Sequence, residues 1–439
     1  MSFFLFFITS FVIGDIQCFV LDTLHDHMTE PELAYYFQND DKFQIPKYEI
    51  VYLPKALSVN EADESESGEE TIEYNFSAFE QPVNLRLKRN KNLLAPGFKT
   101  FIRNGDDDIE VLSNYTKDCH YLNEHGDTVA AISLCQPESI QGIIVLNNET
   151  LEIHPLTQRL QALIKLREPL LDSMSNDEKI PHLIKRATTI PQATFDEVFP
   201  TAGNIWQSQE KAENIENSEE LIFDFNVKEA ASNRPVGGYT LEVAMFFDEA
   251  AYRIFAPFME YDINKLQDML LAYLNGVQAL YHQPSLGTSL QIVLVRLDIM
   301  SRQPSKMYHH NGERSKLLDS FCEYQESLNT DSDSDPDHWD MALYISGLDF
   351  YAIENGKKSG ATMGLATVGG VCHNKYACII AELGTTNAFG KPYPSAGFTS
   401  VYILAHEIGH NLGMHHDSLG NNCAKEGYIM SPSRGTNGE

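Results

Sequence analysis

Near its end, this chain of 439 residues reads Leu404-Ala-His406-Glu407-Ile-Gly-His410-Asn-Leu-Gly413-Met-His-His416-Asp417. Residues four apart share one face of a helix, so His406 and His410 are predicted to direct their imidazoles at one metal ion. Gly413 can adopt a positive φ without strain, which ends the helix and turns the chain back to deliver His416. The pattern therefore predicts three histidines that converge at the end of one helix.

Three neutral imidazoles with an open fourth position suit a catalytic zinc ion, because structural zinc sites usually have four protein ligands. The open position is expected to hold water, whose pKa zinc lowers towards neutrality. Glu407 is predicted to be the general base that takes the proton of this water as it attacks a peptide carbonyl. The alternative is a surface helix that is rich in histidine by chance. His415 competes for the third position, but the Gly-x-x-His spacing favours His416 and leaves His415 to line the pocket.

Composition narrows the class of partner. The 32 Lys and Arg residues against 62 Asp and Glu residues give a formal charge of −30. Such an excess repels phosphates, so nucleic acid and anionic membranes are excluded as partners, whereas a peptide substrate is not. Apolar residues make up 43% of the chain, which is enough for the cores of two or three domains.

The N-terminus predicts the compartment. Ser2 to Gly14 is an apolar run, too short to span a bilayer and suited to the core of a signal peptide that ends after Gly14 or, as we assign it, after Cys18. A buried N-terminal strand is the alternative. No later stretch is apolar enough to span a membrane, so we expect a secreted, extracellular protein that does not cross a membrane. Three sequons agree with glycosylation in the secretory pathway, at Asn75, Asn114 and Asn148.

The chain divides at a change of pattern. Residues 19–234 contain short alternating runs, such as 83–88 and 128–134, which predict half-buried strands, and a polar stretch at 207–220 that is typical of a linker. From 235 to 439 strand-like and helix-like segments alternate. Such alternation indicates a mixed α/β sheet with helices packed on it. We therefore predict a β-rich domain followed by an α/β domain.

The motifs resemble those of the reprolysin branch of the metzincins, and within it the secreted disintegrin-and-metalloproteinase proteins with thrombospondin motifs. Gly427-Tyr-Ile-Met430-Ser-Pro432 follows the third histidine where metzincins have the Met-turn, a tight turn whose methionine lies under the metal. The resemblance covers about residue 80 to the C-terminus. The other stretches that carry it are Leu85–Phe98, Cys119-His-Tyr, Ser133-Leu-Cys135, Gly142-Ile-Ile, Asn148–Leu156, Phe321–Gln325, His338–Ala342 and Thr362–Cys372.

This resemblance implies a metzincin-type catalytic domain at 235–439, preceded by a propeptide at 19–234. It implies that Glu242 and Asp340 bind a structural calcium ion, with ordinary strand-end carboxylates as the alternative. It also implies that Gly364, Leu365 and Ala366 form an edge strand that pairs with an extended substrate.

The seven cysteines form no C-x-x-C pattern, so disulfides are favoured over a cysteine zinc site. The resemblance implies a Cys322–Cys378 bond, and Cys119 and Cys135 are expected to bond to each other. It also places the partners of Cys372 and Cys423 beyond the last residue, because the family continues with further modules, so we expect a truncated chain.

Two functions from different classes remain. The first is a secreted zinc metalloendopeptidase, made as a monomeric zymogen, that acts on extracellular or matrix proteins. The second is a secreted binding protein whose reprolysin half is catalytically inactive. Two basic sequences are candidates for proteolytic activation: Arg86-Leu-Lys-Arg89, which lies in a predicted strand, and Lys185-Arg186.

Overall fold

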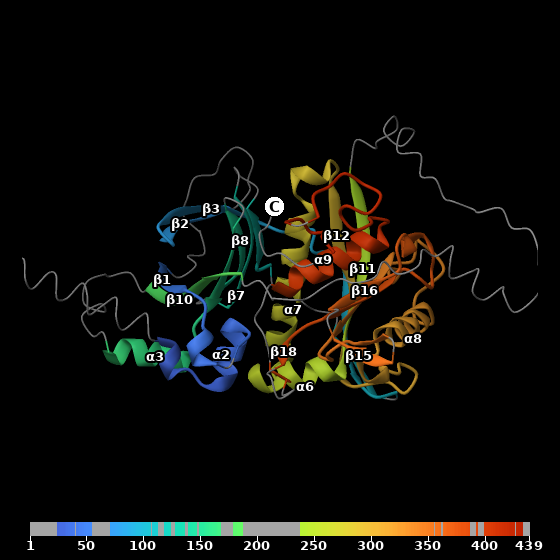
Figure 1. The fold of residues 1–439 in the computed structure, drawn as a ribbon, viewed down its shortest axis with the longest axis horizontal. Helices are drawn as coiled ribbons and strands as arrows, with labels where there is room; N and C mark the ends of the chain where they lie inside the picture. The colour runs from blue at the N-terminus through green and yellow to red at the C-terminus, as the bar shows by residue number, and fades with distance from the viewer. Residues whose placement is uncertain are drawn as a thin grey trace, which may run out of the picture. The chain divides into compact units, whose positions relative to one another are not determined.

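The computed structural model describes residues 24–39, 41–54, 71–106, 108–112, 118–123, 128–136, 139–146, 149–167, 179–187, 238–354, 356–360, 363–386, 392–393, 399–425 and 427–432. The chain forms two compact units, each built around a β-sheet (Figure 1). The first unit contains Met1–Arg89, Asp118–Thr188 and Gly384–Phe398. The second contains Asn90–Lys117, Thr189–Leu383 and Thr399–Glu439.

The first unit is built on an eight-stranded sheet in the order β1-β10-β9-β8-β7-β6-β3-β2, in which the neighbouring strands of each pair run antiparallel. Alternation along the strands buries one face: Val83, Leu85 and Leu87 are buried, whereas Asn84 and Arg86 are exposed. The strands are β1 (Tyr48–Pro54), β2 (Thr71–Ala78), β3 (Gln81–Arg89), β6 (His120–Asn123), β7 (Val129–Gln136), β8 (Ser139–Leu146), β9 (Glu149–Pro155) and β10 (Lys179–Arg186).

Short helices accompany this sheet. The helix α2 (Glu30–Phe37) begins with a capping box, in which the side chains of Thr29 and Glu32 each accept a hydrogen bond from the other's backbone N–H. The remaining elements of the unit are η1 (Leu24–His27), η2 (Lys42–Gln44), α3 (Gln158–Arg167) and the two-stranded ribbon of β18 (Thr385–Thr386) and β19 (Pro392–Tyr393).

Both basic sequences considered for activation lie within strands of this sheet. Arg86–Arg89 belongs to β3, and Lys185-Arg186 belongs to β10, which pairs with β1 on one side and β9 on the other. The Lys185 ammonium is fully buried, 2.6 Å from a carboxylate oxygen of the equally buried Glu152. Burial alone would raise the pKa of Glu152, but Lys185 and His154 hold it at about 2. A protease could reach these peptide bonds only after the strands unpair.

The second unit confirms the predicted alternation of strands and helices. Its seven-stranded sheet has the order β16-β17-β13-β11-β12-β4-β5, parallel throughout except for the antiparallel strands at the two edges. The strands are β4 (Leu94–Asn104), β5 (Asp108–Leu112), β11 (Tyr239–Phe247), β12 (Leu290–Arg302), β13 (Met341–Ser346), β16 (Gly364–Ala366) and β17 (Cys378–Glu382). Of these, β4 and β5 lie on the N-terminal side of the predicted domain boundary at residue 234.

Helices cover both faces of this sheet. On one face, Ala244, Phe246, Ala342 and Tyr344 form a core with Leu317 and Phe321 of α8. Alternate residues of the same strands point to the other face, where α7 and α9 pack against each other and against the strands (Figure 1). The helices are α6 (Glu249–Phe258), α7 (Ile263–Tyr281), α8 (Arg314–Glu326) and α9 (Thr399–Asn411), with short turns η3 (Pro284–Leu286), η4 (His310–Gly312) and η5 (Gly370–Cys372) and the ribbon of β14 (Ala352–Glu354) and β15 (Lys357–Ser359).

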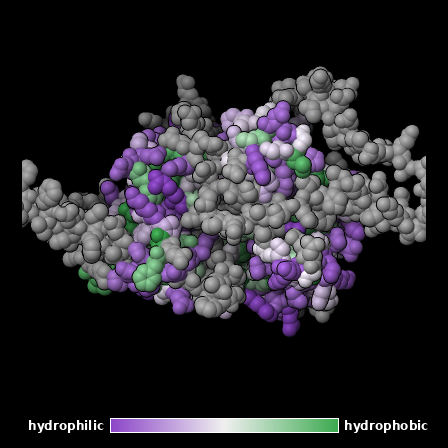
Figure 2. Space-filling model, viewed as in Figure 1, coloured by the Kyte–Doolittle hydropathy of each residue, from purple (hydrophilic) through white to green (hydrophobic). Residues whose placement is uncertain are grey.

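The coloured surface in Figure 2 is mainly hydrophilic, with small hydrophobic groups among the hydrophilic residues.

Candidate active site

The helix α9 carries the first part of the predicted metal site and is buried between the sheet and α7. Val401, Ile403 and Leu404 have no exposed surface. Two tyrosines of α7 anchor it: the Tyr273 hydroxyl donates to the Ser400 carbonyl oxygen at 2.8 Å, and the Tyr281 hydroxyl donates to the Ala405 carbonyl oxygen at 2.7 Å. These bonds fix the position of the helix directly before its histidines.

The three predicted histidines lie together. After α9 the chain turns at Gly413, whose φ of 101° is the left-handed conformation expected there. The return brings Nε2 of His416 to 3.2 Å from Nε2 of His406 and 3.1 Å from Nε2 of His410. Tetrahedral zinc with Zn–N bonds of about 2.0–2.1 Å requires ligand nitrogens roughly 3.3–3.4 Å apart, so the spacing fits within a few tenths of an ångström. His415 is exposed and is not part of this cluster.

Backbone carbonyls fix the tautomers of two of these rings. Nδ1 of His406 lies 2.6 Å from the Ile429 oxygen, and Nδ1 of His410 lies 2.8 Å from the Met414 oxygen. A carbonyl oxygen only accepts, so both Nδ1 atoms carry hydrogen and both Nε2 atoms present lone pairs. An N–H on Nε2 of His416 forms one linear hydrogen bond and so satisfies only one of these two lone pairs, whereas a cation satisfies all three nitrogens.

The site also keeps its imidazoles neutral. Burial, followed by the neighbouring His410, holds the pKa of His406 well below its ordinary value. Burial lowers the pKa of His410 to about 4, and burial with the adjacent His415 lowers the pKa of His416. Because metal ligation requires the neutral ring, these shifts favour metal binding near neutral pH.

The segment of the predicted Met-turn packs under the cluster. The Ile429 carbonyl that orients His406 belongs to it, and the Met430 carbonyl oxygen accepts from the Asp417 backbone N–H at 2.9 Å. A Cβ atom on Gly409 would lie 2.6 Å from Sδ of Met430, so a glycine lets the methionine approach the helix. Sequence reasoning gave Asp417 no role, although its place directly after His416 was the available signal.

Glu407 lies against the edge strand of the sheet. Its side chain is 2% exposed, and a Cβ atom on Gly364 would lie 2.5 Å from its Oε1 atom. Burial raises the pKa of this carboxyl well above its ordinary value, and the buried Arg314 opposes the shift. Sequence reasoning singled out neither Arg314 nor Tyr281, because they reach the site from distant segments.

Gly364, Leu365 and Ala366 form β16, which pairs antiparallel with β17 at one edge of the sheet. Its other side has no partner strand among the residues that the structure describes. An unpaired edge of this kind can accept an extended peptide by adding it as another strand.

The two predicted calcium ligands are neighbours. The Glu242 N–H donates to Oδ2 of Asp340, and the Asp340 N–H donates to the Glu242 carbonyl oxygen, both at 2.8 Å. Ligand atoms of Asp333, His338 and Asp340 lie within 4.8 Å of one another. Burial, and then the charge of Asp340, raise the pKa of Glu242, as expected where carboxylates gather.

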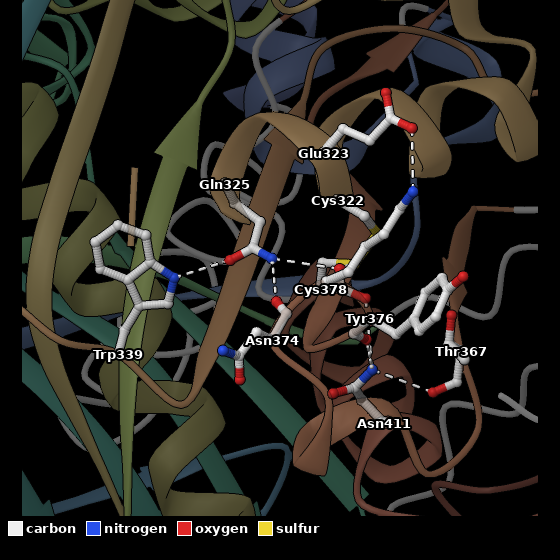
Figure 3. The surroundings of a disulfide bond; sticks show 10 residues. Cys322, Glu323, Gln325, Trp339, Thr367, Asn374, Tyr376, Cys378 and Asn411 are labelled. Carbon is white, nitrogen blue, oxygen red and sulfur yellow. Dashed lines mark hydrogen bonds and ion pairs between the residues drawn. A yellow bond between two sulfur atoms is a disulfide. The ribbon is translucent and has the colours of Figure 1, made fainter. Parts of the chain in front are cut away.

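Two disulfide bonds are present, Cys119–Cys135 and Cys322–Cys378, and they join the pairs given by the sequence analysis. The second links α8 to β17, beside a network of buried amides (Figure 3). Gln325 accepts from the Trp339 indole at 3.0 Å and donates to the Asn374 carbonyl oxygen at 2.7 Å. Asn411, the last residue of α9, donates to the carbonyl oxygens of Thr367 and Tyr376, which ties the end of the helix that carries His406 and His410 to the segment after β16.

The structure describes only some of the other features that the sequence predicted. Asn75 is exposed on β2, whereas Asn114, Asn148 and the predicted signal peptide lie outside the described residues. Cys423 is exposed and has no disulfide partner among the side chains that the structure describes, which do not include that of Cys372. None of the described helices combines the length and apolar character that a membrane crossing requires.

Comparison with known proteins identifies related sequences. Residues 263–438 match a family model described as metallo-peptidase family M12B reprolysin-like, and residues 47–124 match the reprolysin family propeptide. "A disintegrin and metalloproteinase with thrombospondin motifs adt-1" of Caenorhabditis elegans is 27% identical over 95% of this chain and 27% of that protein. The corresponding protein 7 of Rattus norvegicus is 27% identical over 79% of this chain and 20% of its own length. Protein 3 of this group from Homo sapiens is 25% identical over 87% of this chain and 31% of its own length.

The chain thus spans 20–31% of the length of these relatives. Among solved structures, metalloproteinase-II from Bacteroides fragilis aligns with 84% of this chain and 86% of that chain, at a TM-score of 0.35 and 15% identity. Both family models and the relatives name one group of proteases, so the chain belongs to the reprolysin-like M12B family of metallopeptidases.

Proposed function

We propose that this chain is the zymogen form of a secreted zinc metalloendopeptidase that hydrolyses peptide bonds of extracellular or matrix proteins. The observation that carries the proposal is the convergence of three imidazole Nε2 atoms, with neighbouring distances of 3.1 and 3.2 Å. Residues 1–18 would be the signal peptide, 19–234 the propeptide and 235–439 the metalloprotease domain. We expect the protein to act as a monomer.

His406, His410 and His416 would hold the zinc ion. Their fit rests on the two carbonyl-bound Nδ1 atoms, which leave ring lone pairs directed at one point. Zinc bound there supplies Lewis-acid chemistry, polarising a peptide carbonyl and making water acidic enough to lose a proton near neutral pH. Three protein ligands leave a position open for these groups, as catalytic zinc sites do.

The chain's own groups supply the other steps. Glu407 accepts a proton from the attacking water and passes it to the leaving amine. The edge strand β16, formed by Gly364, Leu365 and Ala366, holds the substrate backbone extended through hydrogen bonds from the backbone groups that face away from β17. Met430 packs against Gly409 beside the histidines, and the Glu242–Asp340 pair would bind a structural calcium ion near the N-terminal ends of β11 and β13.

A catalytically inactive binding protein is the second candidate. Burial raises the pKa of Glu407, and an uncharged carboxyl group cannot accept a proton, so this candidate requires a Glu407 that stays protonated. A bound cation would oppose that shift, since a nearby positive charge stabilises a carboxylate.

The test uses the full chain with a recognition sequence for a site-specific protease inserted within the polar stretch at 207–220. Zinc is measured by elemental analysis, and cleavage of a quenched peptide library is followed before and after the insert is cut. We expect one zinc ion per chain, with cleavage that appears after cutting. Glu407→Gln should retain zinc and lose at least about 1,000-fold in rate. Bound zinc without any cleavage that depends on Glu407 would favour the binding protein.

A further inference from the structure

Two strands of the metalloprotease sheet come from the segment that the propeptide model matches. Residues 47–124 match that model, yet β4 and β5 fall within it and belong to the second unit. They form an antiparallel hairpin, with β4 lying parallel to β12. The hairpin therefore supplies one edge of the sheet whose opposite edge is β16.

The hairpin is bonded to the C-terminal part of β12, through β4. Pairing runs from Leu294, opposite Leu94, to Arg302, opposite Asn104. Backbone bonds continue beyond both ends of this pairing: the Leu294 N–H donates to the Leu93 oxygen at 2.9 Å, and the Gly105 N–H donates to the Arg302 oxygen at 3.1 Å. Loss of the hairpin would leave the edge of β12 unpaired between Leu294 and Arg302.

A buried ion pair crosses this junction. Nε of Arg103 in β4 lies 2.7 Å from both carboxylate oxygens of Asp298 in β12, and the Asp298 side chain is completely buried. Arg296 gives Asp298 a second bond at 2.9 Å, while its own guanidinium stacks 3.8 Å above the ring of Phe101 in β4. Removal of the hairpin therefore takes away one counter-charge of Asp298 and the aromatic support of the other.

Polar bonds join the hairpin to two further elements of the unit. Nζ of Lys99 lies 2.7 Å from a carboxylate oxygen of Asp337, in the loop before β13. Asn90, directly before the hairpin, donates to the side chains of Asn275 and Gln278 of α7 at 2.8 and 2.6 Å. Loss of the hairpin would break these three bonds.

We propose that the β4–β5 hairpin is a permanent part of the metalloprotease sheet, so that a chain cut between Arg186 and Tyr239 remains a two-fragment protein joined along β12. The hairpin lies at the edge opposite β16, so its retention leaves the candidate substrate strand uncovered by the hairpin itself. After the chain is cut, the N-terminal fragment would remain bound to the protease domain instead of being released.

The experiment uses the full chain with the protease recognition sequence at 207–220. After cutting, the sample is passed through a size-exclusion column under native conditions, and non-reducing denaturing gels confirm that no disulfide links the fragments. We expect both fragments in one peak at the size of the intact chain. Elution as two separate species would overturn the proposal.

Co-elution alone has a second explanation, because Gly384–Phe398 of the C-terminal fragment groups with the first unit. Amide hydrogen exchange separates the two. We expect the amides of Leu294–Arg302 to exchange at the same rate, within about threefold, before and after cutting. Co-elution with exchange in β12 accelerated more than about tenfold would show that another surface holds the fragments, and would refute the proposal.

A variant tests whether the ion pair between Arg103 and Asp298 stabilises the pairing of β4 with β12. In the cut protein, Arg103→Met should accelerate exchange in β12 at least about tenfold, because it leaves Asp298 buried with a single counter-charge. Arg86→Met is the matched control, since Arg86 lies in the same family match but is exposed on β3. Equal exchange in the two variants would contradict the role given to Arg103. The wild-type measurements decide the main proposal whether or not Arg103→Met folds.

Discussion

The carboxylate of Glu407 lies directly against the backbone of Gly364: a methyl group placed on that glycine would come within 2.5 Å of Oε1 and 2.7 Å of Cγ. The two residues are 43 positions apart in sequence and belong to α9 and β16. The proposed general base and the proposed substrate strand are thus packed together, and the absence of a side chain at residue 364 provides the space for the carboxylate.

Gly364→Ala should therefore displace the Glu407 carboxylate. We expect a loss of about 100-fold in kcat for peptide cleavage, because a displacement of about 1 Å at a reacting group has consequences of this size. Zinc content should not change, since the histidines are untouched. The matched control is Gly360→Ala, whose new methyl group would meet only the Phe350 oxygen, at 3.7 Å. If both variants cleave at the wild-type rate, Gly364 does not position the base.

His410→Ala should abolish stoichiometric zinc binding, because it removes one of three ligands and leaves no protein group to replace it. The chain contains its own control in His415, which is exposed and one residue from His416. His415→Ala should retain one zinc ion per chain. Elemental analysis after dialysis against a weak chelator measures both. Loss of zinc from the His415 variant alone would show that the third ligand was wrongly assigned.

Tyr281→Phe should lower the free energy of unfolding of the second unit by about 1 kcal/mol, since it removes one buried hydrogen bond to the Ala405 carbonyl and keeps the ring. Chemical denaturation measures the change. Tyr239→Phe is the control, because Tyr239 lies in the same unit and its side chain is half exposed. An equal effect of the two substitutions would mean that the bond to α9 adds no stability.

The first unit should lose stability as the pH falls from about 6.5 to about 4. Burial lowers the pKa of His182 from 6.5 to about 4, and its Nε2 atom accepts the Ile140 N–H at 3.0 Å, a bond that protonation would break. Between these two pH values the unfolded chain binds the proton and the folded chain does not, so acidification favours unfolding by on the order of 3 kcal/mol. The loss of stability begins as the pH falls below the pKa of His182 in the unfolded chain, and it is complete near the pKa of His182 in the folded chain.

Hydrogen exchange at Ile140, measured from pH 7 to pH 4 and corrected for the intrinsic exchange rate, reports this change locally. His182→Asn cannot be protonated in this range, so its protection should depend less on pH than that of the wild type. His415→Asn, in the other unit, should behave as the wild type does. A wild-type protein whose corrected protection is constant over this range would contradict the prediction.

Local patterns were sufficient for much of this protein. The spacing of His406, His410 and His416 and the freedom of Gly413 predicted a cluster that forms within eleven residues of chain. The alternation in β3 and the helical spacing in α7 predicted elements that are present. These features depend on the period of a helix or strand, which is written in neighbouring residues.

The basic sequence Lys185-Arg186 is a case in which the local sequence did not predict the structure. Its composition suggested an accessible cleavage site, but the structure buries Lys185 against Glu152. Nothing near Lys185 in the sequence identifies its counter-charge, which lies 33 residues earlier on the next strand.

By itself, then, the sequence determined the chemistry of the site: three imidazoles, a carboxylate and the turn that gathers them. Only the tertiary structure decided that Gly364 faces Glu407, and that Arg103, from a segment matched by the propeptide model, neutralises Asp298 in the metalloprotease sheet. The physical reason is that strand order and buried charge pairs depend on contacts between segments that are distant in sequence and become buried together when the chain folds. Such contacts depend on the packing of the whole sheet, and they produce no periodic pattern in the sequence of any one segment.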